Sequence, residues 1–366
     1  MDIQSQDSVD REPLRRLQHR QGAVLATGDD ATPAPLHFGD PAAEYGAACE
    51  QTALFDLTGR ARIELTGADR ASFLHNFCTN DIKALSPGAG CEAFVTSVKG
   101  RLLGHIFVAA TEDSLWIDSV AGADDFLLSH LDKYLITEDV ELHNRTGEYE
   151  SLLLCGPCTA DSLLAVLDAD VGGLPMGHNA ATVLDERPVM VTRVPFTCQP
   201  TFMLTVEAEL LGRLWDALSF HDARPSGSDV LDPLRIEAGM PVYGQDISDE
   251  HIAQEVGRTA QTISFTKGCY LGQEPIARLD ALGHVNRELR GVRFESSVAV
   301  VVGCPVFDHT GEKEVGRISS VAACPGQEAS VALTTLRREC TGPGTAVRLK
   351  PTPGESVPGE VFWIEN

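Results

Sequence analysis

The stretch Lys267-Gly268-Cys269-Tyr270-Leu271-Gly272-Gln273-Glu274 places a lysine, a cysteine, two glycines and an amide–acid pair side by side. A lysine ammonium near a thiol favours the thiolate, and glycines let the backbone approach a ligand closely. Because Pro275 suits the first turn of a helix, we predict a helix through Ile276-Ala277-Arg278, whose N-terminus would also favour a thiolate. The stretch is therefore either a reactive cysteine at a helix start or a glycine-rich turn around a buried structural cysteine.

The composition argues against several classes of protein. The chain has 366 residues, 29 basic and 53 acidic side chains and a net charge of −24, which disfavours nucleic acid and anionic membranes as partners. It has no apolar run near the ~18 residues of a membrane-spanning helix. The acidic, Gln-containing N-terminus resembles neither a secretory signal nor a mitochondrial transit peptide, so we expect a cytoplasmic protein.

The ten cysteines are scattered, which predicts neither a disulfide framework nor a metal site. Cys155-Gly156-Pro157-Cys158 has the letters of a thioredoxin active site and lies between a predicted strand and a predicted helix. The preceding Leu152-Leu153-Leu154 lacks the usual aromatic residue, and no thioredoxin-like domain surrounds it. We therefore interpret this tetrapeptide as a structural turn.

The periodicity of apolar residues predicts a polar, loosely held lead-in over residues 1–36 and a first α+β unit over 37–147. In this unit we expect strands at 61–65, 92–98, 102–110 and 114–120 and helices near 69–77 and 124–136. The apolar face of the second helix would contain Phe126, Leu127, Leu131, Tyr134 and Leu135.

A similar order of elements recurs over residues 148–287, with strands at 149–154, 189–194 and 201–206 and helices at 159–167 and 210–218. This predicts two related units with mainly antiparallel sheets, in the α+β class. From 288 to 366, short strands separated by glycine and proline turns predict a C-terminal β-barrel or β-sandwich.

Arg235 and Glu237 lie two residues apart on a predicted helix, so their side chains point in different directions. One of them can form an internal pair while the other faces a ligand, and a carboxylate can accept two N–H bonds from a planar ring. A helix with only internal salt bridges is the alternative. Arg278, four residues after Glu274, is a candidate for anion binding, whereas His105 and His284 are isolated.

The octapeptide resembles the K-G-C-[FY]-x-G-Q-E motif of the YgfZ family, folate-binding proteins linked to the maturation or repair of iron–sulphur proteins. Five further stretches resemble the wider GcvT-like superfamily, which includes the aminomethyltransferase of glycine cleavage. They are Phe55-Asp56-Leu57, Gly67 to Asp81, Gly156-Pro157, Leu234 to Gly239 and Gly316 to Ser320. The resemblance extends over about residues 37–350, and it implies three domains around a central folate site.

The resemblance also implies a ligand, partners and roles for individual residues. The cofactor would be tetrahydrofolate or a one-carbon derivative, and the protein partners would be iron–sulphur clients or assembly factors, with tRNA modification as an associated process. Glu237 would bind the pterin, and Cys269 would act near the folate as a thiolate favoured by Lys267. Tyr270, Gln273, Glu274 and Arg278 would hold the loop or the folate.

One stretch departs from the aminomethyltransferase pattern. That enzyme has a Gly-Gly-x-x-Asp-Asp turn with a catalytic aspartate, whereas this chain has Gly100-Arg101-Leu102-Leu103-Gly104-His105. Glycine cannot replace a carboxylate that stabilises charge. We therefore expect a folate-binding protein for iron–sulphur assembly or repair. A folate-dependent aminomethyl or demethylating transferase is the alternative, and a thiol oxidoreductase using Cys155 and Cys158 is a third hypothesis.

Overall fold

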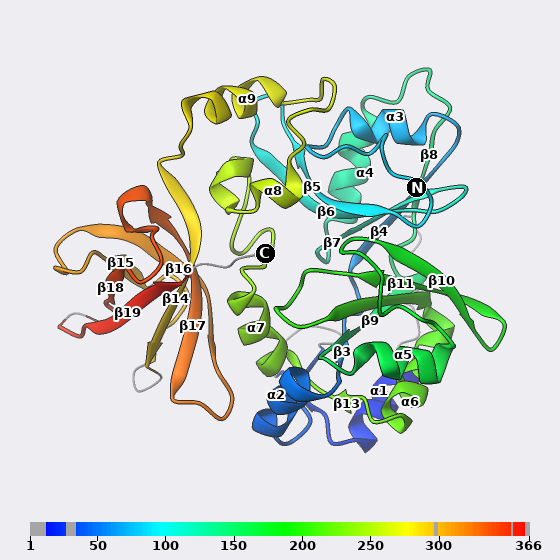
Figure 1. The fold of residues 1–366 in the computed structure, drawn as a ribbon, viewed down its shortest axis with the longest axis horizontal. Coiled ribbons are helices and arrows are strands. Elements are labelled where there is room, and N and C mark those ends of the chain that lie inside the picture. The colour runs from blue at the N-terminus through cyan, green and yellow to red at the C-terminus, as the bar shows by residue number, and fades with distance from the viewer. Residues whose placement is uncertain (1–11, 27–33, 296–298, 353, 363–366) are drawn as a thin grey trace, which may run out of the picture.

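The computed structural model describes residues 12–26, 34–295, 299–352 and 354–362. These residues form two β-sheets with covering helices and a separate β-barrel (Figure 1). None of the helices in these ranges combines the length and the apolar character needed to cross a membrane. The mixture of helices with antiparallel sheets and a closed barrel confirms the predicted α+β class.

The first sheet has five strands in the order β5-β6-β7-β4-β8, and every neighbouring pair is antiparallel. The strands are β4 (Ala61–Thr66), β5 (Gly90–Thr96), β6 (Leu102–Ala110), β7 (Leu115–Ser119) and β8 (Glu141–Asn144). All four predicted strands are present, shifted by at most two residues at an end. β8 was not predicted, because its four residues are at most partly buried and show no apolar alternation.

Helices α3 (Arg70–His75) and α4 (Asp124–Asp132) cover one face of this sheet. Phe73, Leu74, Leu127 and Leu131 pack there against the apolar residues of the strands. Phe126 was predicted to share this face, but its side chain is 50% exposed, which corrects that prediction. The helix ends after Asp132, and neighbouring residues on a helix point about 100° apart, so only one of Phe126 and Leu127 can face the sheet fully.

The second sheet has six strands in the order β10-β11-β12-β9-β3-β13, of which only β13 and β3 pair in parallel. The strands are β3 (Ala53–Asp56), β9 (Tyr149–Cys155), β10 (Asn179–Leu184), β11 (Arg187–Arg193), β12 (Thr201–Glu207) and β13 (Arg224–Pro225). Although β3 falls in the predicted first unit, it pairs with β9 of the second. The four predicted domain ranges remain predictions, and the two sheets do not separate at residue 147.

The outer face of the second sheet is covered by α1 (Glu12–Arg20), α5 (Thr159–Leu167) and α6 (Leu211–Phe220). Leu14 of α1 is 2% exposed, and Arg15 of the same helix forms a buried ion pair with Asp56 at 2.5 Å. The described part of the lead-in is therefore docked, which corrects the prediction of a loosely held segment. Its polar composition concealed this, because the buried polar side chains bond to one another.

The inner face of the second sheet packs at one end against α2 (Pro41–Glu50) and α7 (Ser228–Glu237). A two-stranded ribbon of β1 (Val24–Leu25) and β2 (Pro35–His37) lies near the N-terminus. α2 was not predicted, because its alanine-rich stretch has little amphipathic pattern.

The C-terminal strands close a barrel in the order β14-β17-β16-β15-β18-β19, which confirms the barrel prediction. The strands are β14 (Arg287–Glu295), β15 (Pro305–Phe307), β16 (Glu314–Ala323), β17 (Ala329–Arg337), β18 (Ala346–Leu349) and β19 (Val357–Phe362). Figure 1 shows α7, α8 (Thr259–Thr262) and α9 (Gln273–Leu282) between the barrel and the sheets. Buried residues of this segment join both parts in one apolar cluster.

The octapeptide leads into α9, which begins at Gln273, two residues before the predicted Pro275. Gly272 precedes the helix with a φ of 84°, in the left-handed region that favours glycine. A Cβ atom at Gly272 would lie 2.4 Å from the carbonyl oxygen of Ser97 in the turn between β5 and β6. The motif is thus pressed against this hairpin, and only glycine fits.

We expect Gly272→Ala to cost about 2 kcal/mol more stability than Gly283→Ala. Gly283 ends the same helix with a φ of 74°, but a Cβ atom there meets nothing within 4 Å. The control therefore carries only the left-handed penalty of ~1–2 kcal/mol, while Gly272→Ala adds a backbone collision. Urea denaturation of both variants measures the difference, and equal losses would show that the motif is not pressed against the hairpin.

Candidate functional site: a cavity between the two sheets

A cavity of about 740 Å³ lies between the faces of the two sheets that the outer helices leave uncovered. One wall is a row of directly paired residues across four strands of the first sheet: Glu92, Phe107, Asp118 and Arg62. Alternation along each strand sends apolar residues to the helices and these residues inward. The row places two carboxylates, a guanidinium and an aromatic ring on one cavity wall.

The second sheet supplies the opposite wall. Strands β11 and β12 line the cavity with Met190, Thr192 and Met203. The loop that joins these strands, from Val194 to Pro200, also lines it. Phe196 of this loop contacts Phe107 edge to face, with ring centroids 5.0 Å apart. Aromatic and thioether side chains from both walls therefore give the cavity a large apolar component beside its charges.

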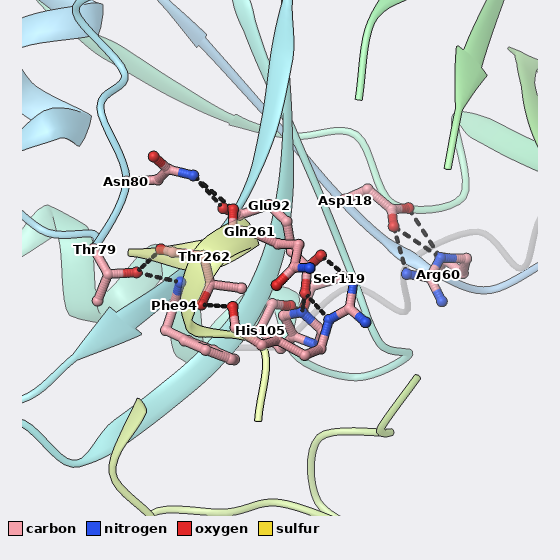
Figure 2. Close-up of polar contacts among 11 residues, drawn as sticks. Arg60, Thr79, Asn80, Glu92, Phe94, His105, Asp118, Ser119, Gln261 and Thr262 are labelled. Atoms are coloured by element: carbon pink, nitrogen blue, oxygen red, sulfur yellow. Dashed lines mark hydrogen bonds and ion pairs between the residues drawn. The ribbon is translucent and has the colours of Figure 1, made fainter. Parts of the chain in front are cut away.

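A buried polar network fixes one end of this wall, as Figure 2 shows. The guanidinium of Arg258 donates from Nε and Nη2 to the two carboxylate oxygens of Glu92, each at 2.6 Å. His105 Nε2 lies 2.7 Å from Glu92 Oε1, and its ring is in contact with Phe94 and Phe107. Burial alone would raise the pKa of Glu92, but the charge and hydrogen bonds of Arg258, helped by His105, outweigh it and lower the pKa to about 2.

A second network holds the other carboxylate of the row. Asp118 accepts hydrogen bonds from Arg60 and forms a 3.1 Å ion pair with Arg62. Arg62 is 1% exposed and also donates to Ser151 of the second sheet, so it joins the two walls. Both carboxylates that line the cavity are thus bound to arginines, and neither is placed as an unpaired catalytic base.

Glu237 lies outside the cavity lining, at the end of α7. Its Oε2 accepts a hydrogen bond from Tyr45 at 2.9 Å, and its Oε1 pairs with Arg293 of the barrel at 2.7 Å. Burial and then the nearby Glu237 charge raise the pKa of Tyr45. Arg235 forms internal ion pairs with Asp232 and Asp246. Both oxygens of Glu237 have protein partners, so its predicted binding of a pterin stays a prediction.

Lys267 is buried and bonded to backbone rather than to a thiol. Its ammonium donates to the carbonyl oxygens of His75, Cys78 and Asn80 at 2.6–2.7 Å. Burial is the main cause that lowers its pKa. It also lies 4.7 Å from the ring centroid of the buried Tyr270. The described contacts make Lys267 a tie between the motif and the segment after α3, and its effect on Cys269 stays a prediction.

The remaining predicted residues do not line the cavity either. Cys269, Glu274 and Arg278 are exposed, and Gln273 is partly buried at the start of α9. The structure thus brings the motif residues together on one side of the β5–β6 hairpin, apart from the cavity lining. Cys198 is the exposed cysteine that does line the cavity, and burial followed by the Glu237 charge raises its pKa. The predicted roles of the octapeptide near a bound ligand stay predictions.

The thioredoxin-like tetrapeptide is a structural turn, as predicted. Cys155 ends β9, is fully buried, and has a pKa raised to about 11, mainly by burial. A Cβ atom at Gly156 would lie 2.3 Å from the carbonyl oxygen of Gln51, so the turn packs tightly. Both cysteines are free thiols. Among the residues that the structure describes, no cluster of His, Cys, Asp or Glu side chains is arranged to hold a metal ion.

The charged residues that line the cavity were not among the predicted site residues. Arg62, Glu92 and Asp118 each interrupt an apolar strand, and a charge at such a position is the informative exception in a buried sheet. Arg258 lies in a short loop with no pattern of its own, and its pairing with Glu92 spans 166 positions of the chain. The first three were detectable as buried polar residues, whereas Arg258 was not.

The fold and the cavity define a three-part α+β protein with a pocket of small-molecule size between two facing sheets. The family model described as the GCVT N-terminal domain matches residues 19–267, more than half of the chain. The chain therefore belongs to the GCVT N-terminal domain family.

Two individual proteins agree with this assignment. The chain is 25% identical to an aminomethyltransferase of Synechocystis sp. (strain ATCC 27184 / PCC 6803 / Kazusa), over 97% of this chain and 94% of that protein. It is similar to the crystal structure of glycine cleavage system aminomethyltransferase T from Bartonella henselae, with a TM-score of 0.81 and 19% identity over 96% of each chain. The second likeness confirms the predicted GcvT-like fold.

The buried pair of Glu92 and Arg258 predicts a specific dependence of stability on pH. Because the pKa of Glu92 is lowered from 4.5 to about 2, its contribution is complete above pH 4.5 and is lost as the pH falls toward 2. We expect Glu92→Gln to cost about 3–5 kcal/mol at pH 7, since it leaves the charge of Arg258 buried without its counterion.

The difference between Glu92→Gln and wild type should narrow when urea denaturation is repeated at pH 3. Glu64→Gln is the control, because it alters a less buried pair of Glu64 with Arg145, the residue that follows β8. It should cost at most about 1 kcal/mol at pH 7. A constant difference for Glu92→Gln between the two pH values would contradict the proposed electrostatics.

Proposed function

We propose that this protein binds tetrahydrofolate, or a one-carbon derivative of it, in the cavity between the two sheets. The cavity itself supports the proposal: 740 Å³ falls within the ~300–1,000 Å³ typical of small-molecule sites. The name of the Synechocystis relative, aminomethyltransferase, supports chemistry on a one-carbon unit. When bound, tetrahydrofolate would supply a carrier for such a unit.

The residues of the cavity fit this ligand. The lining offers apolar and aromatic surfaces to a planar ring system, through Phe107, Trp116, Met190 and Met203. The three arginines of the lining exceed its two carboxylates, which favours an anionic ligand in a protein whose total charge is −24. Within this site the side chains of the chain would bind and orient the folate and exclude water from it.

For the activity, we propose the assembly or repair of iron–sulphur proteins, as the YgfZ-like octapeptide implies. Cys269 supports this by its exposure, because a thiol outside the cavity is accessible to a partner protein. Lys267 and Gly272 fix the backbone on both sides of it, so the thiol stands on an anchored loop. A single thiol contributes too few ligands to hold a cluster, so any contact would be shared with the partner.

Aminomethyl transfer is the second candidate, and the names of both matched proteins favour it. The residues at positions 104 and 105 oppose it. A Cβ atom at Gly104 would point toward Leu127 of α4, whereas His105 lies on the inward face and bonds to Glu92. Of the two acids in the aminomethyltransferase turn, the one that would face inward is therefore replaced here by a histidine with a carboxylate partner.

Isothermal titration calorimetry with tetrahydrofolate tests the binding proposal. We expect saturable binding to wild type and its loss in Ala109→Phe, because the ring would fill the cavity that Ala109 lines. Ala277→Phe makes the same change on the exposed side of α9 and should bind like wild type. Wild-type protein that does not bind tetrahydrofolate would refute the proposal.

Complementation of a gene deletion strain tests the proposed activity. We expect Cys158→Ser to restore iron–sulphur enzyme activities as wild type does and Cys269→Ser to fail, although both cysteines are exposed. Full rescue by Cys269→Ser would rule out the thiol role. Turnover of an aminomethyl-lipoyl carrier protein by purified enzyme and tetrahydrofolate would instead establish aminomethyl transfer.

A further inference from the structure

Several buried polar atoms of the cavity lining have no hydrogen-bond partner. Among the described residues, nine buried side-chain nitrogen or oxygen atoms lack a partner, and four of them belong to residues that line this one cavity. These four are Arg62 Nε, Thr192 Oγ1, Arg193 Nε and Arg258 Nη1. Since buried polar groups are nearly always bonded, such a concentration in one place requires a physical reason.

Arg258 is the clearest case. Glu92 binds the Nε and Nη2 edge of the guanidinium, which leaves Nη1 and its two N–H groups unpaired on a side chain that is 1% exposed. The backbone of Arg258 is also fixed, because its carbonyl oxygen accepts hydrogen bonds from the hydroxyl and the amide of Thr262. The unpaired donor is therefore held in place at the cavity wall.

Thr192 is the corresponding case on the opposite wall. It lies on β11, paired with Asn179 on one side and Met203 on the other, and is 5% exposed. Its hydroxyl has no partner, although elsewhere in the same sheet Ser151 and Thr205 bond to each other. A valine would fill the same volume without the cost of a buried hydroxyl, so stability alone does not account for a threonine here.

We propose that Arg258 and Thr192 are the specificity-determining contacts of the cavity. Arg258 Nη1 would donate to an oxygen acceptor of the bound folate, and the Thr192 hydroxyl would bond to a polar atom of the same ligand. The proposal rests on the proposed folate binding. A folate has three kinds of oxygen acceptor for Arg258: the carbonyl of the pterin, the amide carbonyl of the p-aminobenzoyl group and the carboxylates of the glutamate tail. The guanidinium binds any of them.

Calorimetry with two probes tests this on the full chain: 5-formyltetrahydrofolate, and 6-methyltetrahydropterin, which lacks the formyl group, the p-aminobenzoyl group and the glutamate tail. Thr192→Val should weaken 5-formyltetrahydrofolate binding about tenfold, the equivalent of one lost hydrogen bond. Arg258→Lys keeps the positive charge opposite Glu92 but removes the Nη1 donor. It should weaken the binding of 5-formyltetrahydrofolate at least as much. Arg213→Lys alters a guanidinium outside the lining that binds Asp185 through its Nε and Nη2 atoms, and it should leave binding unchanged.

Each outcome has a distinct meaning. Weaker binding of both probes to Arg258→Lys places the pterin carbonyl at Arg258. Weaker binding of 5-formyltetrahydrofolate alone places there an oxygen that the pterin probe lacks, from the formyl group, the p-aminobenzoyl amide or the glutamate tail. Unchanged affinity in Thr192→Val and Arg258→Lys, with wild type binding, overturns this inference and leaves the proposed function standing. Absence of binding to wild type refutes both. If Arg258→Lys does not fold, Thr192→Val decides, because its melting temperature without ligand should equal or exceed that of wild type.

Discussion

The ion pair between Glu92 and Arg258, together with His105, joins two neighbouring strands of the first sheet to one further segment of the chain. Glu92 belongs to a strand of the first sheet, Arg258 to the segment that leads into the octapeptide, and His105 to the next strand. Taking two charges out of water costs several kcal/mol, which is offset only where geometry and hydrogen bonding are good. The bidentate contact and the histidine meet that condition, so the segment before the motif has one position against the sheet.

The need of buried charges for partners also explains why there is a cavity between the sheets. Two antiparallel sheets that face each other usually pack their apolar side chains into a dry core. Here the facing row contains Glu92, Asp118 and Arg62, whose charges need partners and cannot interdigitate like leucines. Aromatic and methionine side chains fill only part of the remaining space. The inward charges therefore leave a space between the sheets, which Arg62 spans by donating to Ser151, while α2 and α7 pack against the inner face of the second sheet at one end.

The sequence predicted the local elements well, because periodicity is a local signal. β6 and α5 have the predicted bounds, and the barrel follows from short strands between turns. Long-range pairing was not predictable in the same way: no pattern in Ala53–Asp56 shows that this strand joins the sheet of β9. The polar stretch containing Arg15 looked unattached, since its buried partner Asp56 is 41 positions away.

The candidate site was even less predictable from the sequence than the pairing of the strands. The octapeptide stood out because it combines reactive residues within a short stretch, and the structure keeps that combination together beside the β5–β6 hairpin. The cavity is built from single residues of different strands, none of which forms a motif. If the ligand binds in the cavity and the reactive thiol is Cys269, the two are carried by opposite sides of one hairpin. The β5–β6 hairpin is then the element that contacts both, because Glu92 and His105 face inward and the turn at Ser97 packs against Gly272.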